Sequence, residues 1–280
     1  MAWSQLLRGC AFLAGLAGLA GCSGGILPRA PPPMSANELL FVPYTQNFTD
    51  PYDAVVRVQT PLLECSGTLI TPDLVLTARH CVMITRDDPF HAPPFPPEAF
   101  IVGVGGGYAP WGTVGVRAVV TPEPCHGSVL FGDHDLAVLV LHQRVTAVKP
   151  LPARVSAPYA GELVAPSGFG MCNPSWWYLP HRQMSAAGEV VTLFDNRMVL
   201  DAAACPGDSG GPALDVKTGE VVGVISRGGG WGPPDKLEVR SRPHAIATRL
   251  DAYASVIAKA SAIARGEDPK SLVSACVETD

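Results

Sequence analysis

The chain has 280 residues and a formal net charge of −5, with 20 Lys and Arg against 25 Asp and Glu. This mildly acidic balance, without a basic patch, excludes nucleic acid as an expected partner. With 29 Gly, 28 Pro and only 16% charged residues, the composition favours a loop-rich β protein over a helical one.

The first residues predict an export signal. One basic residue, Arg8, precedes an apolar run that is too short to span a bilayer comfortably as a mature helix. The run ends in Leu19-Ala20-Gly21-Cys22, which resembles the bacterial lipobox, so residues 1–21 would be a lipoprotein signal peptide and Cys22 would receive lipid. The alternative is an ordinary secretory signal that leaves Cys22 as a stray thiol. Since Ser23 is not an aspartate, the resemblance implies an anchor in the bacterial outer membrane or at the cell surface.

Residues 22–43 predict a tether, because proline-rich sequence stays extended and has little apolar surface to bury. The folded part is expected to start in the forties, with an N-terminal half over 44–150 and a C-terminal half over 151–280.

Short apolar runs separated by turn residues predict strands throughout both halves. The runs cover 54–59, 67–70, 74–76, 100–104, 114–120, 135–141, 161–165, 188–193, 197–200, 212–215 and 221–225. The one strong helical signal is late, from about 248 to 266, where Leu250, Tyr253, Ile257 and Ile263 fall on or near one face.

Three segments offer groups for covalent catalysis. The segment Gly207-Asp208-Ser209-Gly210-Gly211 can hold one hydroxyl at the tip of a tight turn, beside backbone N–H groups. Upstream, Thr77-Ala78-Arg79-His80-Cys81 offers an imidazole, and Asp133-His134-Asp135 offers two alternative carboxylates. A serine hydroxyl is a poor nucleophile near neutral pH, so an imidazole must accept its proton while a carboxylate fixes the tautomer of the imidazole.

In the chain order His80, Asp135, Ser209, these motifs resemble the chymotrypsin/trypsin family of serine proteases. The resemblance covers residues 44 to 265 or so. It implies an all-β fold of two antiparallel six-stranded β-barrels, N-terminal over 44–150 and C-terminal over 151–280, with a C-terminal helix. It also implies a monomeric serine endopeptidase that cuts protein or peptide substrates through an acyl-enzyme and needs no cofactor and no metal.

The resemblance assigns roles residue by residue. Ser209 is the nucleophile, His80 the general base and acid, and Asp135 the orienting carboxylate, preferred over Asp133 because Leu-Ala-Val-Leu follows it directly. The backbone N–H groups of Gly207 and Ser209 form the oxyanion hole, and the Ser226 hydroxyl supports the carboxylate. The other histidines are expected on the surface or in loops: His91, His126, His134, His142 and His181.

The implied substrate-binding positions are Ala203, Ser226, Gly228 and His244. Ala203, at the base of the specificity pocket, offers no carboxylate for lysine or arginine, so trypsin-like cleavage is not expected. His244 replaces the usual glycine of the far wall, which favours small side chains or, if the imidazole is protonated, acidic ones. Arg227 stands where an aromatic residue usually packs against the substrate.

Six of the eight cysteines remain after Cys10 leaves with the signal and Cys22 is lipidated. An even number in an exported chain favours three disulfides. The resemblance pairs Cys65 with Cys81, and for the rest it favours Cys172–Cys205 and Cys125–Cys276 among three possible pairings. A zinc site is the weaker alternative, since no Cys-x-x-Cys spacing occurs.

Activation departs from the family pattern. Family zymogens are cut before an Ile-Val-Gly-Gly-like start whose new amine pairs with the aspartate next to the nucleophile, here Asp208, yet no such motif precedes Pro51. Either Asp208 has an internal partner or maturation uses another cut. Two other functions therefore stay open: a catalytically silent peptide-binding homologue, and an esterase on the same site.

Overall fold

The computed structural model describes residues 50–84, 93–124, 134–171, 181–229, 244–268 and 276–277. All of them belong to one compact unit, Pro33–Asp280. The predicted signal peptide, the lipidation site Cys22 and the tether lie outside the described residues. None of the described helices is long and apolar enough to cross a membrane.

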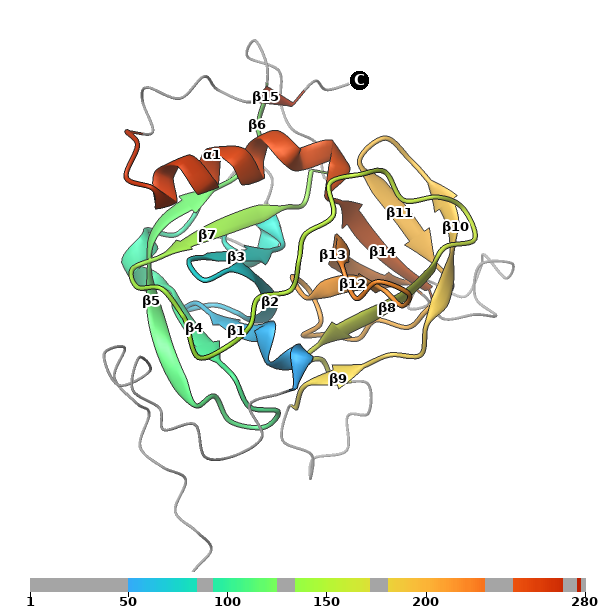
Figure 1. The fold of residues 1–280 in the computed structure, drawn as a ribbon, viewed down its shortest axis with the longest axis horizontal. Coiled ribbons are helices and arrows are strands. Elements are labelled where there is room, and N and C mark those ends of the chain that lie inside the picture. Colours follow the sequence, from blue (N-terminus) through green and yellow to red (C-terminus); the bar gives the residue numbers. More distant parts are fainter. Residues whose placement is uncertain are drawn as a thin grey trace, which may run out of the picture. The chain divides into compact units, whose positions relative to one another are not determined.

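The first half of the chain forms a closed antiparallel barrel (Figure 1). In order around the ring, its described strands are β1 (Val55–Gln59), β2 (Glu64–Thr71), β3 (Leu74–Thr77), β7 (Ala137–Leu141), β5 (Gly112–Val120) and β4 (Ile101–Val104). The ring closes where Val58 of β1 pairs with Val102 of β4. Every residue of β7 is buried, because the barrel interior covers one face and the helix α1 (Ala254–Ala264) packs on the other.

The second half forms the second six-stranded barrel, also antiparallel. Its ring order is β8 (Leu163–Gly168), β12 (Pro212–Asp215), β13 (Val221–Gly229), β14 (His244–Arg249), β11 (Arg197–Leu200) and β10 (Gly188–Leu193). The ring closes where Gly188 of β10 pairs with Val164 of β8. The short strand β9 (Gln183–Met184) extends from β8, and in the described residues β6 (Glu123–Pro124) pairs in parallel with β15 (Cys276–Val277).

The predicted fold of two six-stranded barrels with a C-terminal helix is confirmed, with one difference at the helix start. The predicted helix began near Thr248, but Thr248 and Arg249 complete β14, where Thr248 pairs with both Arg197 and Val224. A single turn of 3-10 helix over Asp251–Tyr253 then leads into α1.

The buried apolar side chains form two clusters. The first consists largely of Val and Leu side chains, fills the first barrel and continues into the helix through Tyr253, Val256 and Ile263; it also takes in Leu214 and Val224 of the second barrel. The second core is built from smaller side chains, including Ala213, Ala245 and Ala247. Burying these apolar surfaces is the main favourable contribution to folding.

Candidate active site

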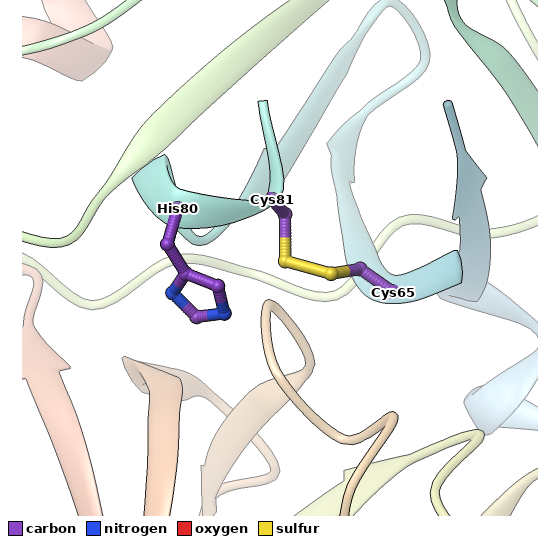
Figure 2. Close-up of side chains that lie close together, drawn as sticks. All are labelled: Cys65, His80 and Cys81. Carbon is purple, nitrogen blue, oxygen red and sulfur yellow. A yellow bond between two sulfur atoms is a disulfide. The ribbon is translucent and has the colours of Figure 1, made fainter. Parts of the chain in front are cut away.

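His80 sits on a single turn of 3-10 helix, Arg79–Cys81, just after β3 ends. The predicted disulfide between Cys81 and Cys65 ties this turn to the start of β2, and Figure 2 shows the imidazole beside it. The ring Nδ1 of His80 lies 2.7 Å from Asp135 Oδ2, and the backbone N–H of His80 donates to Asp135 Oδ1 at 2.9 Å. The carboxylate therefore holds both the ring and the backbone of the histidine.

Asp135 lies two residues before β7 and is buried, with 4% of its side chain exposed against 26% for His80. The Ser226 hydroxyl of β13 donates to Asp135 Oδ2 at 2.6 Å, as the sequence predicted for a carboxylate support. The Thr248 hydroxyl of β14 donates to the backbone carbonyl of Asp135 at 2.9 Å. Both donors come from the second barrel, so Asp135 is held across the contact between the barrels; Asp133 lies outside the described residues.

The charges of His80 and Asp135 stabilise each other. Burial lowers the pKa of His80, but the charge of Asp135 and its hydrogen bond outweigh burial and the opposing charge of Arg227, so the pKa is raised above its ordinary 6.5. Burial raises the pKa of Asp135, yet the charge of His80 and the hydrogen bonds from His80 and Ser226 bring it below its ordinary value. The pair can therefore hold an imidazolium when one forms.

Ser209 lies on the loop that leads into β12, between two glycines with left-handed backbone. Gly207 has φ of +103° and Gly210 has φ of +87°, and a Cβ on Gly210 would come within 2.1 Å of the Ser66 carbonyl. Both positions thus require glycine. The Ser209 hydroxyl donates to the Ser226 carbonyl at 3.2 Å, and within the described residues no hydrogen bond joins it to His80. Catalytic hydrogen bonds often form only when substrate binds.

The predicted oxyanion donors have a specific backbone setting. Among the described residues, neither the Gly207 N–H nor the Ser209 N–H donates a hydrogen bond. The Met171 N–H donates to the Pro206 carbonyl at 2.9 Å. Because C=O and N–H point in opposite directions across a trans peptide, this contact turns the Gly207 N–H away from Met171.

Asp208 has the internal partners that the sequence analysis left open. Its buried carboxylate accepts hydrogen bonds from the backbone N–H groups of Gly170 and Cys205, each at 2.8 Å. Burial raises the pKa of Asp208, and these two hydrogen bonds oppose the rise. A Cβ on Gly170 would come within 2.5 Å of this carboxylate, so the approach needs glycine.

The structure brings the predicted substrate-binding positions onto neighbouring segments. Gly228 of β13 lies against Ala204, so that a Cβ on Gly228 would come within 2.1 Å of the Ala204 carbonyl. Ala203 is partly buried beside it, and His244 pairs with Gly229 at the start of β14. Arg227 of β13 is exposed.

The remaining cysteines are only partly described. Cys205 is disulfide-bonded, and its predicted partner Cys172 lies outside the described residues, as does Cys125. The backbone of Cys276 pairs with Glu123, two residues before Cys125. Among the described residues, the one group that could bring three metal-ligand atoms within 4.8 Å of one another is Cys65, His80 and Cys81, and its two sulfurs are bonded to each other.

One histidine contact near the site has no signal in the sequence. His134 lies in the loop before β7, as expected, but it is buried there, and its Nδ1 lies 2.8 Å from the Tyr253 hydroxyl. The contact links the start of the C-terminal helix to the residue before Asp135. His142 is exposed and His181 partly buried, while His91 and His126 lie outside the described residues. The helical periodicity marked Tyr253 as buried but carried no signal for its partner.

A second missed residue, Arg182, holds the start of the described chain. Its guanidinium forms ion pairs with Asp53 at 2.7 Å and Asp50 at 2.6 Å. Its backbone N–H donates to the Gly107 carbonyl at 2.7 Å. Arg182 precedes β9 directly, so these contacts join the second barrel to the N-terminal end of the first.

Two closed six-stranded barrels with a paired His and Asp beside a Gly-Asp-Ser-Gly-Gly loop define the class of chymotrypsin-fold serine peptidases. The family model of the trypsin-like peptidase domain matches residues 65–224. The chain therefore belongs to the trypsin-like peptidase family, and the predicted enzyme class, a serine endopeptidase, is confirmed.

Curated relatives agree with this family. The vitellin-degrading protease of Bombyx mori is 27% identical over 212 residues, which cover 67% of this chain and 75% of the relative. Hypodermin-B of Hypoderma lineatum is 26% identical over 193 residues, covering 61% and 70%.

Solved structures share the fold. A Glu endopeptidase in complex with MPD has a TM-score of 0.61 at 20% identity and covers 78% of this chain and 94% of its own. Neuropsin, a serine protease expressed in the limbic system of mouse brain, has a TM-score of 0.57 at 20% identity and covers 78% and 97%.

Proposed function

We propose that this serine endopeptidase uses Ser209 as nucleophile, His80 as general base and acid, and Asp135 as the carboxylate that orients the imidazole. One observation carries the proposal. Asp135 holds the His80 ring at 2.7 Å, and Ser209 lies two residues after Gly207, whose φ is +103°. The nucleophile, base and carboxylate thus come from three distant parts of the sequence to one contact between the barrels.

Catalysis begins when the Ser209 hydroxyl turns from the Ser226 carbonyl to His80 Nε2. Since Nδ1 donates to Asp135, Nε2 is the nitrogen free to accept a proton. Ser209 Oγ attacks the peptide carbonyl while His80 takes its proton, and Asp135 stabilises the resulting imidazolium. The N–H groups of Gly207 and Ser209 stabilise the oxyanion of the tetrahedral intermediate.

The acyl-enzyme forms when the intermediate collapses and His80 returns the proton to the leaving amine. Water then enters, His80 accepts a proton from it, and hydroxide attack on the ester carbonyl releases the carboxylic acid product and regenerates the Ser209 hydroxyl. Every proton moves through His80 Nε2.

For specificity we propose a preference for small P1 residues, with acidic residues as the alternative. Gly228 lies against the Ala204 carbonyl, which leaves little room between these two walls of the proposed P1 pocket. Ala203, at the base of the pocket, adds no charge that would attract lysine or arginine. His244 could supply positive charge for an acidic residue only when protonated. An assay of matched Ala, Glu, Phe and Arg peptides decides the matter: best cleavage after Ala supports a small pocket, best cleavage after Glu an acidic one, and best cleavage after Phe or Arg rejects both.

We further propose that the enzyme acts as a monomer exported and anchored to the bacterial outer membrane or cell surface through lipid on Cys22. The support is the Leu19-Ala20-Gly21-Cys22 motif and the tether that follows it. Metabolic labelling with palmitate of the wild-type chain and Cys22→Ala, followed by membrane fractionation, tests the anchor. Label in both forms, or in neither, would contradict it.

A fluorophosphonate serine probe and intact-mass measurement test the catalytic proposal on the purified full chain. One adduct on the wild type and none on Ser209→Ala supports it. No adduct on the folded wild type would favour the silent peptide-binding alternative. An adduct together with turnover of activated esters but of no peptide would favour the esterase.

A further inference from the structure

Ser66 lies directly beneath the nucleophile loop, although it belongs to the first barrel. It follows Cys65 in β2 and is fully buried. Its backbone N–H donates to the Ser209 carbonyl at 2.8 Å. Its hydroxyl donates to the Gly207 carbonyl at 2.7 Å and accepts the Phe169 N–H at 2.9 Å. One residue therefore holds the carbonyls of both Gly207 and Ser209.

These contacts act on the peptides that flank the oxyanion donors. The peptide before Gly207 is held by Met171, whose N–H donates to the Pro206 carbonyl. The peptide after Gly207 is held by the Ser66 hydroxyl. With both neighbouring peptides fixed, the left-handed Gly207, whose conformation is otherwise open to rotation, keeps one orientation of its N–H.

The hydroxyl of Ser66 fits this position because it is both a donor and an acceptor. The Gly207 carbonyl needs a donor and the Phe169 N–H needs an acceptor, and the Ser66 hydroxyl serves both groups. The 168–170 segment approaches this closely because its glycines lack a Cβ: one on Gly168 would come within 2.8 Å of Ser66 Oγ.

We infer that Ser66 is a positioning residue, which holds the oxyanion-hole backbone of the second barrel from the first barrel through its buried hydroxyl. This inference rests on the proposed function of Gly207 and Ser209. Ser66 itself does not reach the substrate. Its effect falls on the transition state, because the oxyanion needs its donors in place only when the tetrahedral intermediate forms.

Ser66→Ala in the full chain tests the inference, with Thr71→Val as matched control. Thr71 lies at the other end of the same strand, β2, and its hydroxyl donates to Asp73 Oδ1 at 2.7 Å in the turn that leads to β3. We expect Ser66→Ala to lower kcat by roughly 10-fold to 100-fold with KM changed less than about threefold, since the lost interaction matters in the transition state. Thr71→Val should lower the Tm with a kcat near that of the wild type, and Ser66→Thr, which keeps the hydroxyl, should recover most of kcat.

Two results would overturn the inference. One is a Ser66→Ala kcat within twofold of the wild type. The other is a loss of kcat that follows the loss of Tm equally in Ser66→Ala and Thr71→Val, because the role of Ser66 would then be structural alone.

Residue-resolved amide exchange of the wild-type chain gives a readout that needs neither activity nor a folded variant. The Phe169 amide should exchange at least about tenfold more slowly than the amides of Gly207 and Ser209. Of these three amides, only that of Phe169 donates a hydrogen bond to Ser66. Equal exchange rates would overturn the inference even in an active enzyme. A wild type that neither cleaves peptides nor takes the fluorophosphonate contradicts the proposed function instead, and the exchange rates still decide whether Ser66 holds the loop.

Discussion

Replacing Asp135 by Asn should nearly abolish peptide cleavage while leaving the fold intact. The carboxylate accepts three hydrogen bonds, two from the ring and backbone of His80 and one from Ser226. An amide of the same size presents an N–H₂ group that cannot accept the ring proton. His80 would then carry its proton on Nε2, and this nitrogen could no longer accept the proton of Ser209.

The expected loss in kcat is about 10⁴-fold, as in this class of triad, which corresponds to about 5.4 kcal/mol of transition-state stabilisation. The pH profile should change as well. Without the Asp135 charge, burial and Arg227 both lower the pKa of His80, so residual activity should persist to lower pH than wild-type activity does.

Stopped assays of kcat and kcat/KM across pH on the wild type, Asp135→Asn and Asp133→Asn measure both effects. Asp133→Asn is the control, because it makes the same replacement of a carboxylate by an amide at the nearby aspartate. A large loss in Asp133→Asn with little loss in Asp135→Asn would refute the assignment. An acidic limb that stays in place in Asp135→Asn would refute the electrostatic argument.

Three further predictions concern pH and stability. The acidic limb of kcat/KM in the wild type should have its midpoint above pH 6.5, because the base is active only when neutral and the pKa of His80 is raised; a midpoint below 6.5 would contradict this. Arg117→Met should reduce the free energy of unfolding in urea by about 1 kcal/mol without changing kcat, because Arg117 donates to the Ile263 and Ala264 carbonyls at the end of α1, and an unchanged urea midpoint would argue against that cap. Replacing both Cys65 and Cys81 by Ser should cost about 3 kcal/mol, because the disulfide closes a loop with a sequence separation of 16; wild-type stability in the double variant would show that the bond contributes little.

The parts of the site that the sequence predicted are those encoded locally. His80, Asp135 and Ser209 each stand in a short motif whose neighbours identify them, and the glycines of the nucleophile loop mark its turn. The hydroxyl of Ser226 was also found, because it belongs to a recognisable strand. Each of these predictions needed only adjacent residues and their order.

The parts that the sequence missed depend on contacts between distant residues. Ser66 lies 141 positions from Gly207 and His134 lies 119 from Tyr253, so no local pattern pairs them. The helix start was misplaced because Thr248 and Arg249 stand between apolar residues, a pattern that fits either a helix or a strand. These two residues are in a strand because β14 pairs with β11 and β13, which are distant in sequence.

The division of the proposed catalytic groups between the barrels has a consequence for when the enzyme can be active. His80 and Asp135 belong to the first barrel. Ser209 belongs to the second, as does Ser226, whose hydroxyl donates to Asp135. A chain with only one barrel folded thus lacks either the base or the nucleophile. During synthesis, when unfolded copies are the easiest peptides to cut, a half-folded molecule cannot attack its neighbours. A damaged molecule likewise loses activity once either barrel unfolds.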